Sequence, residues 1–320
     1  MDRKCEKTYA ISNFFSTNPL TIQYSRTNYF LTLRIANYMT SSRHFTTRYL
    51  FLTVIVSLLS LTVSSQVIPL PHAYAHNDYW HKRPLLDAMA NGFTHFEADV
   101  YLRRSKLLVA HRLPFLKKRH TIERLYLKPL LHQLTNTQAQ AQTPLDTVVL
   151  MIDIKSNGKK TYAALRSILN KYKAILSTCE KGKVTIRNLT LVLTGHRPLK
   201  LLKSEESRFV FADADLRKIN NTEDCPEMFT MASCKYSSLL KWKGKGEIPE
   251  TEKENLVQLV NKAHLSGTKV RLWGSPENEI VWNFLRDCGV DLISTDKLVA
   301  LKQFFTRDAE NAPLTGKFGE

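Results

Sequence analysis

Carboxylates and histidines lie in the first half of this 320-residue chain at spacings that could serve metal-assisted catalysis. Glu97 and Asp99, in the segment FEADV, are two residues apart, so in an extended strand both side chains point to the same side. Two like charges on one side of a strand repel each other unless a cation joins them. Asp153, in the segment LMIDIK, adds a third carboxylate, and three hard oxygen ligands favour Mg²⁺ or Ca²⁺ over a softer metal.

Two histidines bracket Glu97 and Asp99 along the chain, His76 before them and His111 after them. A pair of histidines beside a cation could serve as general base and general acid. Lys155 follows Asp153 by two residues and would reach the same side of its strand, where it could meet an anionic group or form a salt bridge with the carboxylates. Each group also has an ordinary structural alternative, because a single histidine most often makes one hydrogen bond and a carboxylate pair can lie on an exposed strand.

The elements that must position these groups are short strands that alternate with helices from residue 72 onward. Strands are predicted at 72–76, 94–100, 106–111, 147–155, 189–195, 209–214, 229–234, 269–274 and 290–295, and helices at 82–91, 159–176, 250–265, 277–288 and 297–305. Repeated strand–helix units predict parallel strands with right-handed crossovers. About eight such units suit an α/β fold of the (β/α)8 TIM-barrel type. A doubly wound open sheet is the alternative, although no glycine-rich dinucleotide fingerprint follows any strand.

Active sites of such barrels lie at the carboxyl ends of the strands. The polar and aromatic residues predicted at those ends are His76, Glu97, Asp99, His111, Asp153, Lys155 and Trp273. We therefore expect them to meet at one mouth of the barrel.

These motifs, taken in order, resemble the phospholipase C-like phosphodiesterase superfamily, which includes glycerophosphodiester phosphodiesterases and phosphatidylinositol-specific phospholipases C. The segments that carry the resemblance are HNDY, EAD, the later His111, IDIK, RLWGSPEN and GVDLISTDKL, and the resemblance covers about residues 72–305. The segments AHNDY and RPLLDA are most similar to the fungal altered-inheritance-of-mitochondria protein 6 family and its secreted bacterial relatives. The resemblance implies a TIM-barrel phosphodiesterase.

The resemblance also implies a role for each matching residue. It implies catalytic roles for His76 and His111, a divalent cation, Mg²⁺ or Ca²⁺, on Glu97, Asp99 and Asp153, and substrate contacts for Asn77, Lys155 and Trp273. The sequence departs from the glycerophosphodiesterase pattern at Asn77, where an arginine would directly follow the first histidine. This weakens the expectation of glycerophosphodiester activity, although Asn77 can donate a hydrogen bond to a phosphate or ligate the cation. Asp78 could orient His76 or cap the following turn, and both readings stay open.

The predicted function is metal-dependent hydrolysis of a phosphoric diester, a phospholipid or glycerophosphodiester-like substrate, by two-histidine acid–base catalysis with an open or a cyclic product. The alternative is a catalytically silent barrel that binds anionic lipid headgroups or cell-surface polymers through its basic surface, since the net charge is +17. An amidohydrolase-type metal site is disfavoured, because His72 and His76 do not form an H-x-H pair. The basic residues form no long block with interleaved aromatics, so we expect no nucleic-acid partner. We also expect a monomer that could make peripheral contact with a membrane.

The chain is predicted to have one large domain with extensions at both ends. Residues 66–306 form the barrel, residues 1–65 an N-terminal extension, and residues 307–320 a C-terminal tail. An apolar fraction of 43% suits a full core. None of the five cysteines forms a C-x-x-C pair, which makes a zinc ribbon improbable, and one disulfide among the last four would be compatible with export.

An uncharged apolar run at 49–63 predicts that the protein is exported. Arg43 and Arg48 precede the run and the small residues of SSQ follow it, which is the pattern of a secretory signal peptide. Met39 is well placed as the true start of that signal, which would make the protein secreted or periplasmic. A spanning helix needs about 20 apolar residues, so the alternative of an uncleaved membrane anchor is less favoured.

Overall fold

The computed structural model describes residues 67–112, 117–137, 147–219 and 227–311. Residues 1–66 lie outside the described residues. The predicted signal peptide at 49–63 and the predicted start at Met39 therefore stay predictions. Within the described ranges, no helix has both the length and the apolar character that a membrane crossing requires.

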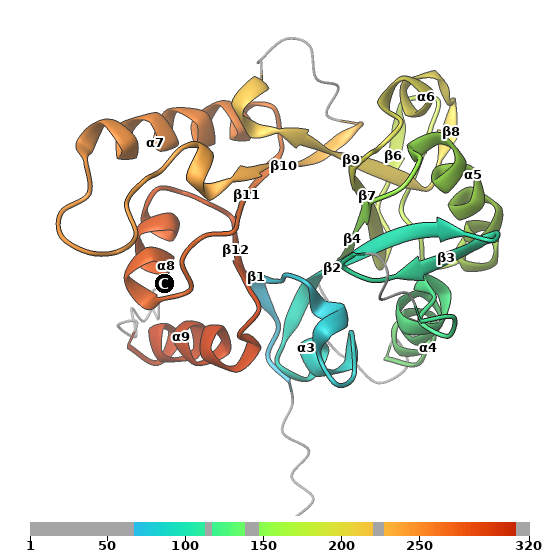
Figure 1. Cartoon of the computed structure of the whole chain (residues 1–320), viewed down its shortest axis with the longest axis horizontal. Helices are drawn as coiled ribbons and strands as arrows, with labels where there is room; N and C mark the ends of the chain where they lie inside the picture. Colours follow the sequence, from blue (N-terminus) through green and yellow to red (C-terminus); the bar gives the residue numbers. More distant parts are fainter. Residues whose placement is uncertain (1–66, 113–116, 138–146, 220–226, 312–320) are drawn as a thin grey trace, which may run out of the picture. The chain divides into compact units, whose positions relative to one another are not determined.

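Eight parallel strands close into a barrel, which confirms the predicted fold class (Figure 1). In spatial order they are β1 (Leu70–Ala75), β2 (Phe93–Arg103), β4 (Val148–Ile154), β7 (Leu189–Gly195), β9 (Val210–Asp215), β10 (Phe229–Lys235), β11 (Lys269–Trp273) and β12 (Leu292–Thr295). Strand β1 pairs in parallel with both β2 and β12, so the ring has no free edge. A doubly wound open sheet is thereby excluded, because such a sheet ends in two unpaired edges.

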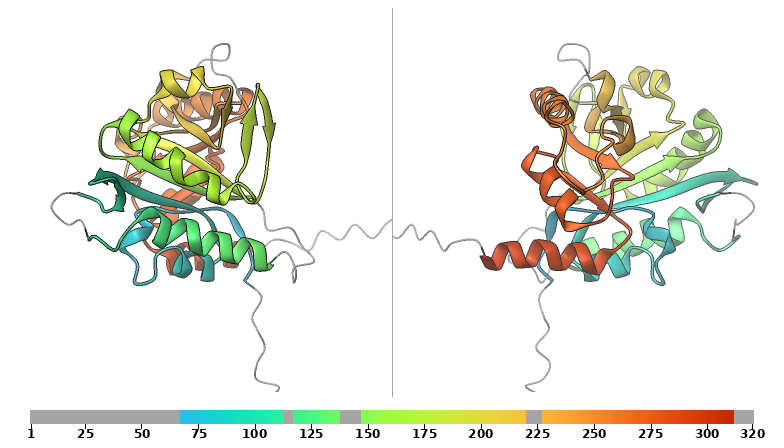
Figure 2. Two further views of the ribbon diagram at one scale, coloured as in Figure 1. Left: turned by 90° about the vertical axis from the view of Figure 1, so that its right-hand side faces the viewer. Right: turned by 60° about the vertical axis from the view of Figure 1, so that its left-hand side comes forward.

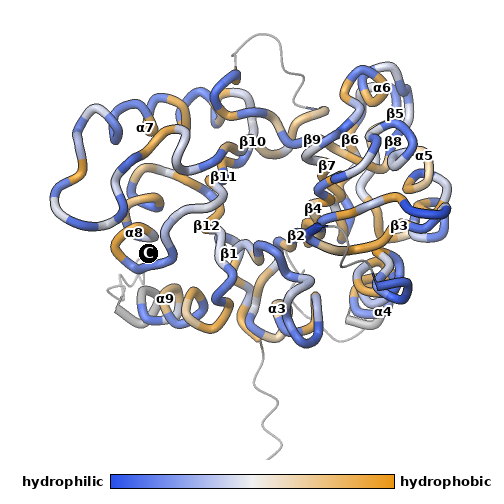
Figure 3. Tube along the Cα trace, viewed as in Figure 1, coloured by the Kyte–Doolittle hydropathy of each residue, from blue (hydrophilic) through white to orange (hydrophobic). Residues whose placement is uncertain are grey.

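Helices surround the barrel on its outside (Figure 1). They are α3 (Leu86–Ala90), α4 (Lys128–Thr137), α5 (Gly158–Leu169), α6 (Leu199–Ser204), α7 (Glu250–Leu265), α8 (Glu279–Asp287) and α9 (Leu298–Asn311). Figure 3 shows hydrophobic and hydrophilic stretches alternating along α7, as expected for a helix with one face packed on the strands. The helix predicted at 159–176 ends earlier, at Leu169, whereas the last helix runs beyond the predicted residue 305 to Asn311.

The interior of the barrel changes from apolar to polar within two residues on most strands. A buried apolar layer includes Tyr74, Met151, Val192, Phe211, Met231 and Leu292. Two residues further along the same strands, or just past the end of β1, are His76, Asp153, Thr194, Asp213, Ser233 and Ser294. Because side chains two apart in a strand share a face, the apolar layer forms a floor and the polar groups stand above it at the carboxyl ends.

The short strand predicted at 106–111 is not a barrel strand. It forms β3 (Lys106–Val109), which pairs antiparallel with β2 in a hairpin that projects from the barrel (Figure 2). The amide of Ala110 donates to the carbonyl of Asp99 at 3.2 Å, so the returning strand brings His111 back to the level of the carboxylates. His111 thus reaches the mouth because β3 runs against the other strands, and not as the end of a parallel strand.

A small antiparallel sheet, which is not hydrogen-bonded to the barrel strands but packs against their interior apolar layer through Cys179, was absent from the sequence prediction. Its strands are β5 (Thr178–Glu180), β6 (Lys183–Thr185) and β8 (Ser207–Arg208). Cys179 on β5 is buried with a free thiol, as are Cys234 and Cys288. Among the described residues, therefore, these three cysteines do not pair with one another, while Cys225 lies outside the described ranges.

The loop after β1 is held by Asp78. Its buried carboxylate accepts hydrogen bonds from the Leu85 amide at 2.6 Å and the Tyr126 hydroxyl at 2.8 Å. Burial raises the pKa of Asp78 to about 6, although these two hydrogen bonds oppose the shift. Of the two roles open for Asp78, orienting His76 or stabilising the following turn, the structure favours the second.

Replacing Asp78 with alanine would leave two buried donors without an acceptor. We expect Asp78→Ala to lower the free energy of unfolding by about 2–6 kcal/mol, since each of the two unpaired donors costs about 1–3 kcal/mol. Urea denaturation measures this, and Asp87→Ala is the matched control, because Asp87 pairs with the exposed Arg83 on the surface. Equal stability of the two variants would contradict the assigned role.

Candidate active site

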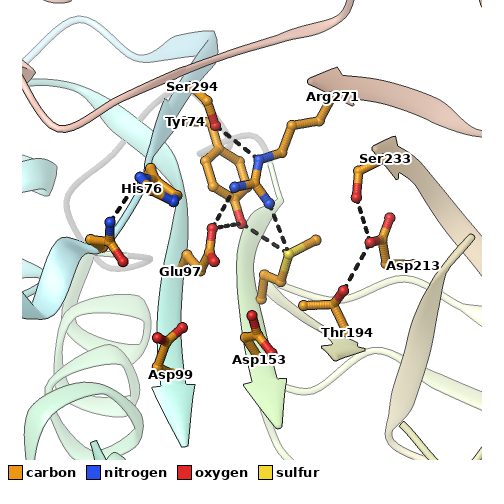
Figure 4. A network of polar contacts seen from close by, with 12 residues as sticks. Tyr74, His76, Glu97, Asp99, Asp153, Thr194, Asp213, Ser233, Arg271 and Ser294 are labelled. Carbon is orange, nitrogen blue, oxygen red and sulfur yellow. Dashed lines mark hydrogen bonds and ion pairs between the residues drawn. The ribbon is translucent and has the colours of Figure 1, made fainter. Parts of the chain in front are cut away.

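The carboxyl ends of the barrel strands surround a cavity of about 740 Å³. All eight residues proposed from the sequence line it, namely His76, Asn77, Glu97, Asp99, His111, Asp153, Lys155 and Trp273. Figure 4 shows the carboxylates of Glu97, Asp99 and Asp153 on the two adjacent strands β2 and β4. His72 and His81, from the same histidine-rich stretch as His76, do not line this cavity.

The three carboxylates are close enough to share one cation. Glu97, Asp99 and Asp153 each offer an oxygen, and these atoms all lie within 4.8 Å of one another. The Oδ1 atoms of Asp99 and Asp153 are buried without a hydrogen-bond partner. Buried carboxylate oxygens are unfavourable unless a donor or a cation compensates them, so the residues present fit a hard divalent cation.

Among the three carboxylates, Asp99 has a pKa that is clearly raised. Burial raises its pKa to about 7, and the negative charges of Glu97 and Asp153 add to the shift while the ammonium group of Lys155 opposes it. A divalent cation at the site would favour the ionised carboxylate and displace the proton.

Glu97 is held in place by Arg271, a residue that the sequence interpretation did not single out. The Arg271 Nη2 atom donates to Glu97 Oε2 at 2.5 Å, and its Nε donates to Ser294 Oγ at 2.9 Å (Figure 4). The guanidinium carbon lies 3.9 Å from the ring centroid of Tyr74. Burial alone would raise the pKa of Glu97, but Arg271, His76, Lys155 and the Tyr74 hydroxyl together outweigh it and the pKa is lowered.

Lys155 forms salt bridges with the carboxylates, which was one of the two roles that the sequence analysis proposed for it. Its Nζ donates to Asp153 Oδ2 at 2.6 Å and lies 3.4 Å from Asp99 Oδ2. Asp153 is also approached by the backbone of β7 at Gly195, where a Cβ atom would lie 2.1 Å from Asp153 Oδ1. A glycine with φ of +65° therefore makes room for the carboxylate at this point.

His76 is oriented by Asp296, a second residue that the sequence interpretation missed. The His76 Nδ1 atom lies 2.9 Å from Asp296 Oδ1 and 3.0 Å from the side-chain nitrogen of Asn77. When Nδ1 carries a proton, it donates to Asp296 and accepts nothing from the Asn77 amide, which leaves Nε2 as a proton acceptor. Asp296 directly follows β12, inside the motif GVDLISTDKL, so its place at a strand end was the available signal.

His111 is held by Asp99 of β2 and by two aromatic residues of the loop after β1. Its Nδ1 atom lies 3.2 Å from both Asp99 Oδ2 and the Tyr79 hydroxyl, and its ring packs edge-on against Trp80 at 5.2 Å between centroids. Partial burial lowers the pKa of His111, and the positive charge of Lys155 adds to the effect. Both histidines therefore have one ring nitrogen fixed by a carboxylate.

The remaining wall of the cavity comes from β7, β9, β10 and β11. Trp273 stands there half-exposed, with the Lys235 ammonium 5.8 Å from its ring centroid. The same wall includes Arg197 and the buried Asp213, which the sequence interpretation did not select. Asp213 follows the interior residue Phe211 by two, so the strand period would have placed it inside the barrel.

Several known proteins are similar in sequence to most of this chain. The profile of the AIM6-like phosphodiesterase domain matches residues 61–213. The altered inheritance of mitochondria protein 6 of Eremothecium gossypii is 30% identical over 271 residues, which cover 73% of this chain and 69% of the relative. The protein of the same name from Lachancea thermotolerans is 31% identical over 288 residues, covering 74% of this chain and 66% of the relative.

The chain belongs to the altered inheritance of mitochondria protein 6 family. Its matched phosphodiesterase segment contains both histidines and the three carboxylates, whereas Arg271, Trp273 and Asp296 follow it in the sequence. Among solved structures, a calcium-dependent phosphoinositol-specific phospholipase C from a Pseudomonas species superposes with a TM-score of 0.48 at 12% identity, over 72% of this chain and 89% of that one.

Metal binding to this family member should depend on pH, because Asp99 must lose its proton. With a pKa of about 7 for Asp99, the affinity for Ca²⁺ or Mg²⁺ should rise by up to about tenfold per pH unit from pH 5 to 7 and then level off. Calorimetric titration measures the affinity. Asp99→Asn should abolish binding, while Asp215→Asn, which changes a cavity carboxylate already paired with Arg217, should not. A pH-independent affinity that survives Asp99→Asn would rule out the site.

Proposed function

We propose that this protein is a metal-dependent phosphoric diester hydrolase that acts on a phospholipid or glycerophosphodiester-like substrate. The observation that carries the proposal is the carboxylate cluster, with two buried unpartnered oxygens, in one cavity with two carboxylate-bound histidines. Membership of a family with a phosphodiesterase domain supports the same reaction class.

The cation would be held by Glu97, Asp99 and Asp153. When bound, it supplies positive charge that stabilises the non-bridging oxygens of the phosphate in the transition state. Lys155 contributes a further positive charge at the same place, since its ammonium group already lies against two of the three carboxylates. A phosphate anion is therefore the group that best matches the charge of this side of the cavity.

The two histidines divide the proton transfers. With Nδ1 bound to Asp296, His76 accepts a proton at Nε2 from the attacking group. The attacking group is either a water molecule or a hydroxyl of the substrate next to the phosphate. The oxygen forms its bond to phosphorus as the bond to the leaving alkoxide breaks, and His111 donates a proton to that alkoxide. The bound phosphate raises the pKa of His111, which offsets the lowering seen without substrate.

Removing either histidine should abolish most of the turnover. We expect His76→Ala and His111→Ala each to lower kcat by about 10²–10⁴-fold, because general acid–base catalysis contributes that much. Phosphorus NMR on glycerophosphodiesters, phosphatidylinositol, lysophospholipids and sphingomyelin, with Mg²⁺, Ca²⁺ or EDTA, measures turnover and separates cyclic from open products.

The matched control is His72→Ala, because His72 lies outside the cavity and contacts the Asp291 carbonyl. Losses below about tenfold in both site variants would contradict these roles. Binding of an anionic lipid without any turnover, insensitive to EDTA, would instead support the catalytically silent barrel.

Asp296 should act through His76 and not independently. We expect Asp296→Ala to lower kcat by about tenfold or more with little change in KM, because the imidazole loses its orienting partner. A double-mutant cycle checks this: once His76 is alanine, the further change at Asp296 should cost almost nothing. Equal losses with and without His76 would show that Asp296 does not work through the histidine.

A further inference from the structure

A second cavity, called here the amino-end cavity, lies at the opposite end of the barrel from the candidate active site. Its volume is about 450 Å³, and its lining includes Thr94 and His95 of β2, Thr230 of β10 and Lys269 of β11. These residues are at the amino ends of their strands, whereas the candidate active site is at the carboxyl ends. The buried apolar layer lies between the two cavities, and Met231 of this layer also lines the amino-end cavity. A ligand held there would therefore be remote from the proposed chemistry.

The two-residue period of the strands places a further layer of side chains below the apolar floor. His95 precedes Glu97 by two residues and Lys269 precedes Arg271 by two, so both belong to the interior faces of their strands. The ring centroid of His95 lies 6.5 Å from that of Tyr74, a member of the apolar layer, which agrees with this position inside the barrel. The barrel interior is therefore polar at both ends and apolar between them.

His95 has one ring nitrogen without a partner. The residue is 2% exposed, its Nδ1 lies 3.0 Å from Thr94 Oγ1, and among the described residues nothing hydrogen-bonds to its buried Nε2. Burial lowers the pKa of His95 to about 3, and the positive charges of Lys269 and His72 add to the shift, so the imidazole is neutral at physiological pH. A neutral imidazole carries one proton. When the Thr94 hydroxyl donates to Nδ1, that proton is on Nε2, which is then an unused donor.

Thr230 supplies a second unused donor to the same cavity. Its Oγ1 atom is buried and has no hydrogen-bond partner within the described ranges. The pairing of β10 with β9 shifts register between Phe229 and Met231, so Thr230 stands at an irregularity of the sheet. Such irregularities change the direction of a side chain, and Thr230 lines the cavity together with its neighbour Met231. Buried polar groups without partners are unfavourable, and a ligand in the cavity would supply an acceptor for both His95 and Thr230.

The charge of the amino-end cavity is positive. Lys269 is exposed and, in the part of the chain that the structure describes, forms no ion pair, and no aspartate or glutamate is among the described lining residues. The carboxylate of Asp291 is already engaged, since its Oδ2 lies 2.8 Å from His264 Nε2 and accepts from the Val270 amide at 2.7 Å. The cavity therefore offers two neutral donors and one ammonium group, which together match the oxygens of a small anion.

We propose that the amino-end cavity binds a small oxyanion, a phosphate or a carboxylate, through His95, Thr230 and Lys269. The His95 Nε2–H and the Thr230 hydroxyl donate to oxygens of the anion, and the Lys269 ammonium group neutralises its charge. The site is independent of the proposed reaction, because no residue of the candidate active site takes part in it.

Calorimetric titration of the full chain with inorganic phosphate or with acetate, in the presence of EDTA, tests the site and separates the two kinds of oxyanion. We expect Thr230→Val and Lys269→Gln each to weaken binding of the favoured anion by about tenfold or more, because hydrogen bonds to charged groups are the stronger ones. Lys245→Gln removes an exposed lysine outside the cavity and is the matched control, which should leave the affinity unchanged. Without the anion, Thr230→Val should not lower the free energy of unfolding, because its hydroxyl has no partner to lose.

Nitrogen-15 NMR of the histidine rings shows where the anion binds, since the candidate active site also carries positive charge. The His95 resonances, assigned with His95→Gln, should place the proton on Nε2 and should shift when the favoured anion is added. Binding of neither anion, a His95 proton on Nδ1, affinities that neither variant changes, or His95 resonances that ignore the bound anion would overturn the proposal. A loss of stability in anion-free Thr230→Val would also overturn it, because the hydroxyl would then already have a partner.

Discussion

Three carboxylates forced into one buried corner are the constraint on which the rest of this site depends. Glu97, Asp99 and Asp153 lie on two adjacent strands with paired register, so their repulsion cannot be relieved by turning away. The fold compensates them with two cations of its own, Arg271 and Lys155, and leaves two oxygens unpaired. Because the built-in compensation is incomplete, the remaining negative charge would suit the divalent ion of the proposed reaction, and that ion would in turn attract a phosphate.

The two-residue period of the barrel strands places these carboxylates directly above an apolar layer. Below the carboxylates the interior is filled by apolar side chains such as Met151 and Val192, and one step higher the same strands present Asp153 and Thr194. A floor of buried apolar side chains strengthens the electrostatic interactions directly above it, and the burial of Asp99 there raises its pKa. The loop after β1 and the β2–β3 hairpin then add the two histidines from above the strand ends.

Most of the fold and the central residues could be predicted from the sequence, because burial on both faces of a parallel strand produces apolar runs that stop at the mouth. The antiparallel direction of β3 could not be predicted from the sequence. Its turn, Arg104 and Ser105, has φ of +47° and +62°, as in a two-residue hairpin turn, yet lacks the glycine or asparagine that usually signals one. Arg271 and Asp296 were missed for another reason: each matters through a partner distant in sequence, Glu97 or His76, and strand periodicity does not reveal which partner a side chain meets.

The positive charges of Arg271 and Lys155 lie at different distances from the three carboxylates, so the carboxylates differ in their tendency to ionise. Arg271 binds Glu97 inside the barrel and holds it ionised, so Glu97 presents a charge whether or not an ion is bound. Lys155 lies closer to Asp153 than to Asp99, and Asp99 keeps its proton up to about neutral pH. Asp99 also accepts a hydrogen bond from the Tyr79 hydroxyl and contacts His111. The carboxylate that would lose its proton to the proposed cation is therefore the one that holds the imidazole of the proposed acid, so the metal site and the acid share one group.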